Sequence, residues 1–197
     1  MKHQRRVIRV IVAALCLTTA SPAWASAPHA TSLAQIALQS GDLPAGFQTV
    51  RNGYLDSGHV AQSSHSTVAN LKRLGWVGAY ESVFKQPGAA LSVQNVIDRF
   101  ASANVAHTAY LQMAKNYAAA FRAYHPHYVS AAGLGQNATQ IEYTQRIKNA
   151  QVTVNSIAFL QGSYIALVNL AGSPGTLKQV SASHIIQRLR ARMQRGG

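Results

Sequence analysis

ATQIEYTQRIKNAQVTVNSIAFLQGSYIALVNLAG, residues 138–172, contains three extended segments separated by two short turns. In the first segment, Ile141 and Tyr143 alternate with polar residues, which is the pattern of a strand with one buried face. The third segment is apolar on both faces, as expected for a strand in the middle of a sheet. With turns at residues 148–150 and 161–163, the stretch predicts a three-stranded antiparallel meander.

Two further elements are predicted before the meander. The segments GWVGAYESVFK and ALSVQNVIDRF, residues 75–85 and 90–100, flank a Gln-Pro-Gly turn and predict a β-hairpin. Residues 102–124 predict a long amphipathic helix, because apolar side chains recur there at spacings of three and four. The expected core stripe of this helix consists of Ala106, Tyr110, Met113, Tyr117, Phe121 and Tyr124.

The segment TSLAQIALQSGDLPAGF, residues 31–47, predicts a short helix followed by a turn. Thr31 or Ser32 is the expected N-cap, and Gly41 is the expected C-terminal cap, since a left-handed cap favours a residue without a Cβ. Leu-Pro-Ala-Gly then fits a type I turn. These roles leave Asp42 without a structural explanation, beyond capping the turn itself.

The remaining segments complete the predicted order. Residues 57–66 are small and polar and predict a loop, and residues 66–74 predict a short helix capped by Ser66. After a Ser-Pro-Gly break, a final helix is expected from Thr176 to about Gln194. Its expected core stripe is Ile185, Ile186, Leu189 and Met193. The order predicts an α+β fold, in which helices pack on an antiparallel sheet of five to six strands in an α/β/α sandwich-like arrangement.

The first 25 residues have the three-part layout of a secretory signal peptide. A basic start is followed by an apolar core of 11 residues, VIVAALCLTTA, and by small residues at Ala23 and Ala25. This core is too short to span a bilayer as a stable anchor. The pair Arg5-Arg6 leaves twin-arginine export open, although the surrounding residues favour ordinary secretion.

Cleavage after Ala25 leaves a flexible leader, residues 26–31, and a single α+β domain, residues 32–195. The one cysteine of the chain, Cys16, falls in the removed segment. The mature chain is therefore expected to have no disulfide, no thiol nucleophile and no Cys-ligated metal. We expect it to be secreted or exposed at the cell surface, with no transmembrane segment after signal cleavage.

The mature chain is strongly basic. It keeps 14 of the 18 lysines and arginines against five acidic residues, which gives a net charge of +9. This excess favours anionic partners, such as cell-wall polymers, lipid headgroups or extracellular nucleic acid. The alternative is that the protein is basic without a specific anionic partner, as secreted proteins of some bacteria are.

Three short segments carry a resemblance to known proteins: DLPAGF at residues 42–47, YESVFK at residues 80–85 and VIDRFASANVAHTAY at residues 96–110. On these residues the chain resembles Mog1/PsbP-like α/β/α-sandwich proteins, and small secreted bacterial proteins with a DLPAGF-type opening. The resemblance covers about residues 33–194. It implies a non-catalytic surface or extracytoplasmic module, and it implies no particular functional residues.

Residue types that carry catalysis are sparse in the mature chain. Its five carboxylates are far apart in sequence, whereas a paired-carboxylate hydrolase needs two at a fixed separation. Ser82-Val83-Phe84-Lys85 matches the Ser-x-x-Lys pattern, but its companion motifs are absent and residues three apart on a strand point to opposite faces. The sequence therefore predicts no catalytic residues.

Histidines are the remaining candidates for a metal site. His125 and His127 flank a proline, while His59 and His65 lie in the predicted loop. Zinc needs three or four ligands, and no cysteine or carboxylate near these histidines completes a set. The sequence therefore predicts neither a metal site nor a cofactor.

The C-terminal segment SHIIQRLRARMQRGG carries a basic edge. On a helix, Arg188, Arg192 and Arg195 lie along one side at spacings of four and three, with Arg190 on the far flank. Arginine suits phosphate and carboxylate groups, so the three residues are candidates for binding an anionic surface. Alternatively, they are solvated cations that interact favourably with the negative end of the helix dipole.

These observations favour a secreted or cell-surface binding module that is not an enzyme. Its candidate partners are an anionic envelope polymer, a lipid surface or another envelope protein, and no motif indicates recognition of a specific nucleic acid. The alternative is a small extracytoplasmic hydrolase with a histidine-centred site. The hydrolase hypothesis requires His107, His125 or His127 to lie close to Asp98 or Glu142 in a deep cleft.

Overall fold

The structure is a computed structural model that describes residues 32–64, 66–131, 133–135, 137–147 and 150–196. The predicted signal peptide and leader lie outside the described residues, as does Thr31, one of the two predicted N-caps. The side chain of Tyr117, predicted on the core stripe, also lies outside the described part.

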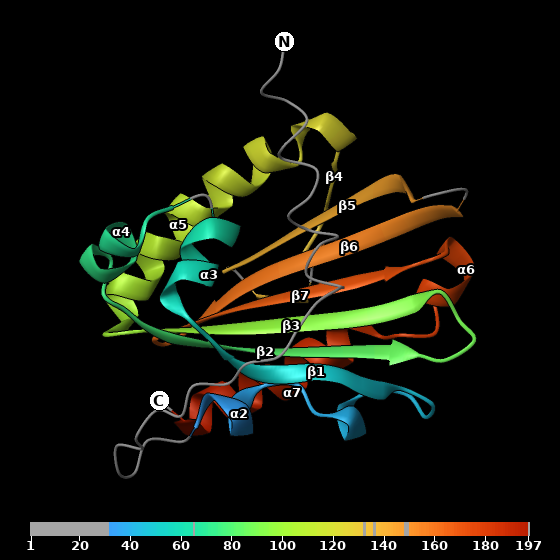
Figure 1. Ribbon diagram of the computed structural model, residues 1–197, viewed down its shortest axis with the longest axis horizontal. Helices are drawn as coiled ribbons and strands as arrows, with labels where there is room; N and C mark the ends of the chain where they lie inside the picture. The colour runs from blue at the N-terminus through green and yellow to red at the C-terminus, as the bar shows by residue number, and fades with distance from the viewer. Residues whose placement is uncertain (1–31, 65, 132, 136, 148–149, 197) are drawn as a thin grey trace. The chain divides into compact units, whose positions relative to one another are not determined.

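The described chain forms a seven-stranded antiparallel sheet in the order β1-β2-β3-β7-β6-β5-β4 (Figure 1). The predicted hairpin and meander are confirmed, and β7 occupies the centre of the sheet. The strands are β1 (Gln48–Leu55), β2 (Trp76–Gln86), β3 (Leu91–Phe100), β4 (His127–Val129), β5 (Ala138–Ile147), β6 (Ala150–Gln161) and β7 (Tyr164–Gly172).

The prediction of five to six strands was too low because the two edge strands, β1 and β4, were missed. An edge strand needs hydrogen bonds from one neighbour only, and it can form without an apolar face. All three residues of β4 are exposed, and no residue of β1 is fully buried. Neither segment therefore shows the alternating apolar pattern on which the sequence prediction relied.

Helices cover both faces of the sheet (Figure 1). Helices α2 and α7 contact each other and pack on one face, while α4 and α5 pack on the other, together with α3. The helical elements are α2 (Leu33–Ile36), η1 (Ser40–Asp42), α3 (Ser57–Ser63), α4 (Val68–Arg73), α5 (Ala103–Ala120), η2 (Arg122–Tyr124), α6 (Pro174–Leu177) and α7 (Ala182–Gly196).

Four local predictions need correction. Residues 57–63 form helix α3 and not a loop, since Asp56 caps it by accepting a hydrogen bond from the His59 N–H. The next helix is capped by Thr67 rather than Ser66. Gly41 lies inside the 3₁₀ turn η1 instead of ending a helix. The final helix is split into α6 and α7.

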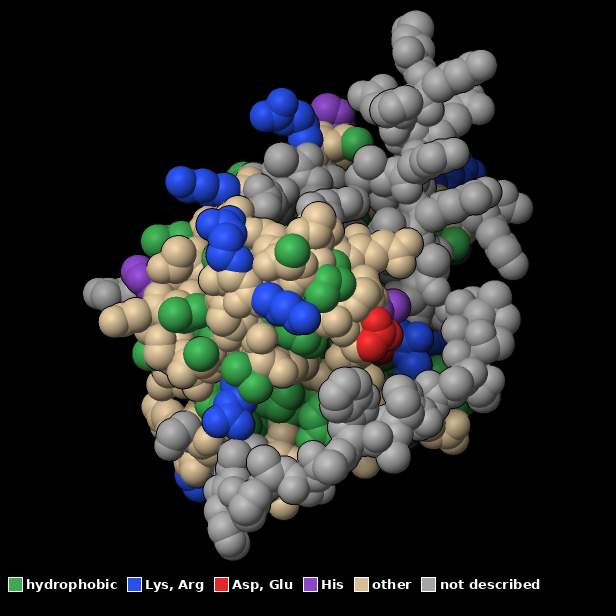
Figure 2. All heavy atoms as spheres, turned by 60° about the vertical axis from the view of Figure 1, so that its left-hand side comes forward, with side chains coloured by type: hydrophobic (Ala, Val, Ile, Leu, Met, Phe, Trp, Pro, Cys, Tyr) green, Lys and Arg blue, Asp and Glu red, His purple; other side chains and the backbone are tan. Residues whose placement is uncertain are grey.

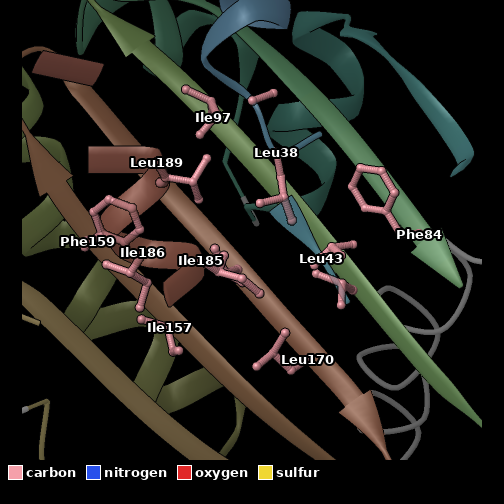
Figure 3. Close-up of a cluster of buried hydrophobic side chains, with 14 of the residues drawn as sticks. Leu38, Leu43, Phe84, Ile97, Ile157, Phe159, Leu170, Ile185, Ile186 and Leu189 are labelled. Carbon is pink, nitrogen blue, oxygen red and sulfur yellow. The ribbon is translucent and has the colours of Figure 1, made fainter. Parts of the chain in front are cut away.

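One continuous apolar core lies between the sheet and α7 (Figure 3). Side chains from four strands meet there, including Phe84, Ile97 and Leu170, and Leu38 and Leu43 from the N-terminal segment join them. The predicted α7 stripe is confirmed, because Ile185, Ile186, Leu189 and Met193 are all buried.

The face beneath α3, α4 and α5 is built differently. Its apolar side chains form three separate clusters: one under α5, one under α3 and α4, and one under η2. Ala106, Tyr110 and Phe121 of the predicted stripe are buried, whereas Met113 and Tyr124 are half-buried. The apolar packing on this face is therefore interrupted.

Candidate functional site

Asp42, the unexplained residue of the N-terminal motif, joins that motif to α7. Its buried carboxylate accepts a hydrogen bond from the Gln39 N–H at 2.8 Å and pairs with the Arg192 guanidinium at 2.6 Å. Arg192 also donates to the Ala37 carbonyl at 2.9 Å. The bridge connects residues 150 positions apart, so Arg192 has a structural role that the sequence did not reveal.

The other two arginines of the predicted basic edge project into solvent. Arg188 and Arg195 are exposed, and neither side chain forms a hydrogen bond or ion pair within the described part of the chain. Their neighbour Arg190 is held over the Phe159 ring, 5.1 Å from its centroid, and donates to the Leu134 carbonyl. The structure thus places two of the three predicted residues where a partner can reach them.

Most carboxylates of the described chain are engaged internally. Asp42 and Glu81 are buried in ion pairs, and Asp56 caps α3. Asp98 accepts a hydrogen bond from the Trp76 indole N–H at 2.8 Å, and its burial raises its pKa to about 6. These acidic side chains therefore offset little of the positive charge at the surface.

The surface over α4 and α5 reflects this imbalance (Figure 2). Lys and Arg side chains are spread singly across this face, and little acidic surface accompanies them. The positive field is thus a general property of this side of the domain, in addition to the exposed arginines of α7.

The histidines predicted for the alternative hydrolase do not form a catalytic cluster. His127 lies opposite Glu142 in the β4–β5 ladder, but no hydrogen bond or ion pair joins these two described side chains. His107 and His125 are exposed on other elements. Among the described residues, no group of three or more His, Cys, Asp or Glu side chains is placed to hold a metal ion.

A row of polar side chains that was not predicted from the sequence crosses five neighbouring strands. Arg51 of β1 pairs with Glu81 of β2 at 2.6 Å, and Gln94 of β3 donates to Glu81 at 2.6 Å. Asn169 of β7 donates to Gln94 at 2.9 Å, and Ser156 of β6 donates to Asn169. We call these five residues the polar row.

The polar row lies on the face that carries α3, α4 and α5. Gln94 is two residues from Val96, which packs beneath α3 and α4, and it adjoins Val93, which packs in the α7 core. Successive side chains on a strand point to opposite faces, so Gln94 shares the face of Val96. The row accordingly runs where the apolar packing of this face is interrupted.

The signal for this row was present in the sequence but incomplete. Asn169 stands in the otherwise apolar strand β7, which marks it as an exception, whereas Gln94 and Ser156 stand in strands that carry several other polar residues. What brings them together is the register of β3, β7 and β6, in which Gln94 pairs with Asn169 and Asn169 with Ser156. The pairing of β3 with β7 spans the whole of α5 and could not be deduced from local pattern.

Comparison with solved structures gives the fold a point of reference. No family model matches the chain, and no curated protein matches it. The structure is similar to that of the extracellular domain of PknH from Mycobacterium tuberculosis, with a TM-score of 0.60 and 12% sequence identity over 85% of this chain and 98% of that chain. At this identity the likeness shows a shared fold. The resemblance to Mog1/PsbP-like proteins stays a prediction.

Within the described residues, no helix combines the length and the apolar character that crossing a membrane requires. Helix α7 keeps its apolar side chains in the core, and none of the large exposed hydrophobic side chains of the described chain lies on it. An interaction through the exposed side of α7 would therefore depend on charge and hydrogen bonding.

Proposed function

We propose that the protein is an extracytoplasmic binding domain, without catalytic activity, that docks on an anionic envelope surface through the exposed edge of α7. The observation that carries this proposal is that most acidic side chains are engaged within the fold while basic side chains of α7 are free to bind a partner. The carboxylates are largely engaged within the fold, whereas Arg188 and Arg195 are exposed and unpaired within the described chain.

The extracytoplasmic location is supported by the signal-like residues 1–25 and by the fold shared with an extracellular domain. Arg192 completes the basic edge, but Asp42 matches its charge and its side chain is only 19% exposed. We therefore assign the binding to Arg188 and Arg195. Near an anionic membrane each such cation contributes about 1 kcal/mol, so the two together change partitioning roughly thirtyfold.

Sedimentation with vesicles tests this proposal. The purified protein is expected to sediment with phosphatidylglycerol-containing vesicles, or with anionic wall fragments, at low salt, and to be released as salt shortens the Debye length. The double variant Arg188→Gln/Arg195→Gln is expected to lose most of this binding.

The matched control is Lys72→Gln/Lys115→Gln, which removes the same charge from exposed positions on α4 and α5. If both double variants lose binding equally, the net charge of the protein is responsible and α7 is not a docking edge. If the parent never sediments at low salt, the anionic-surface proposal is wrong.

A further inference from the structure

We propose that the polar row is a binding site for a neutral, polyhydroxylated ligand of the oligosaccharide class. This site is distinct from the basic edge of α7, because the row lies on the opposite face of the sheet. The strands that carry it, β1, β2, β3, β7 and β6, lie side by side (Figure 1).

The polar row is not required to complete an apolar core. On the α7 face, strands β2, β3, β7 and β6 support one continuous apolar cluster, whereas the opposite face is divided into three. Glu81 and Ser156, 3% and 1% exposed, are fully buried members of the row. Burying polar groups is costly unless hydrogen bonds compensate, so such a row contributes less to stability than apolar residues would.

The polar row also has unused hydrogen-bonding capacity. Each amide has two N–H groups, and Gln94 and Asn169 each donate only one of them within the described part of the chain. The Nε of Arg51 is buried and has no hydrogen-bond partner there. Buried donors without acceptors are rare and costly, so an additional acceptor is expected at this face.

The groups of the polar row indicate the chemistry of that acceptor. The charges of Arg51 and Glu81 cancel within their ion pair, so the row offers no net charge to attract an ion. Its half-buried members, Arg51, Gln94 and Asn169, offer donors and acceptors in alternation instead, from a guanidinium and two amides. A hydroxyl group can donate one hydrogen bond and accept up to two, so a molecule with many hydroxyl groups can bond to both the donors and the acceptors of the row.

The size and surroundings of the row fit an extended ligand of this kind. Five neighbouring strands span about 19 Å at a spacing of about 4.8 Å. Ser156 lies opposite Ile141, which belongs to an apolar cluster against which the half-buried Tyr124 packs. An apolar and partly aromatic cluster next to the Ser156 end of the row suits a sugar, whose C–H face is apolar and whose edges carry hydroxyls.

Nuclear magnetic resonance can test the proposal directly in the parent protein. The probes are neutral malto-, cello- and manno-oligosaccharides of about four units, added to about 10 mM so that binding with a millimolar Kd is detected. We expect at least one to shift the side-chain NH₂ resonances of Gln94 and Asn169. If no oligosaccharide shifts them, or if the shifts occur elsewhere in the protein, the proposal is wrong.

Variants of similar shape provide the second measurement. Gln94→Met and Asn169→Leu are expected to weaken binding by about tenfold or more, since each removes hydrogen bonds made to the ligand. The control is Gln140→Met, which breaks an amide pair with Asn155 on the α7 face of the same sheet and is expected to change affinity by less than about twofold. Equal oligosaccharide affinity in all three variants would overturn the proposal. If a variant fails to fold, the titration of the parent protein followed by magnetic resonance decides the matter.

The two proposals fail independently. Arg188→Gln/Arg195→Gln removes the exposed arginines of α7 and is expected to leave oligosaccharide binding unchanged. Conversely, Asn169→Leu is expected to leave vesicle binding unchanged. If each of these variants abolishes both vesicle binding and oligosaccharide binding, neither site acts as described.

Discussion

The bridge between Asp42 and Arg192 allows a specific prediction about stability. Arg192→Gln leaves the carboxylate of Asp42 in place, with a side chain only 5% exposed and one remaining hydrogen bond, from the Gln39 N–H. Removing one partner of a buried ion pair costs about 3–5 kcal/mol, and less where a partner is partly exposed, as Arg192 is at 19%. We therefore expect a loss of about 3 kcal/mol, including the lost bond to the Ala37 carbonyl.

In a domain of this size, a loss of about 3 kcal/mol lowers Tm by roughly 6–12 °C. Arg188→Gln is the matched control, because Arg188 lies one helical turn earlier on α7 and is exposed. Its free energy of unfolding should change by less than about 0.5 kcal/mol. Urea denaturation or calorimetry of the two variants at neutral pH measures the difference.

The reverse substitution should be less costly. Asp42→Asn keeps the shape of the side chain and an acceptor for Gln39, and the unpaired Arg192 can turn toward solvent, so a loss of about 1–2 kcal/mol is expected. The double variant should then lose less than the sum of the two single losses, as expected for residues in contact. If Arg192→Gln and Arg188→Gln unfold at the same urea concentration, the bridge does not stabilise the domain and the reasoning is refuted.

Two further predictions concern the opposite face of the sheet. Because burial raises the pKa of Asp98 from 3.8 to about 6, its contribution to stability is greatest below pH 3.8 and is lost as pH rises through 6. Asp98→Asn should therefore raise the free energy of unfolding at pH 7.5 by up to about 3 kcal/mol, and this increase should shrink toward pH 4. An increase in stability that does not depend on pH would contradict the prediction. Met113→Asp should destabilise the domain by about 2 kcal/mol or more, because Met113 packs against the apolar cluster under α5. The control is Leu111→Asp, at a position that is 50% exposed, which should have little effect on stability. Equal melting temperatures of the two variants would show that the Met113 side of α5 is not core.

The parts of the fold that local pattern determines were predicted well from the sequence. The period-two alternation of the meander, the part of the α5 stripe at Ala106 and Tyr110, and the apolar face of α7 all arise from side chains that are buried. The edge strands β1 and β4 were missed because they bury little, and α3 was missed because its one clear signal was the Asp56 cap. Composition alone does not distinguish a polar helix from a loop.

The candidate sites were predicted less well, for a different physical reason. The arginine edge could be found because a helical repeat brings Arg188 and Arg195 together locally. The engagement of Arg192 by Asp42, and the polar row, depend on contacts between residues far apart in the chain. Such contacts follow from strand order and helix docking, which local periodicity does not specify.

The connection between the first and last described elements has a consequence for how the chain folds. The N-terminal segment that carries Leu38 and Asp42 completes its core against α7, and β3 acquires its partner β7 only after α5, β4, β5 and β6 have been made. A chain emerging from its N-terminus therefore exposes Leu38, Phe84 and Ile97 until nearly all of it is available. Since non-local pairing slows folding, the domain should stay open through most of its synthesis and close late, as one cooperative unit.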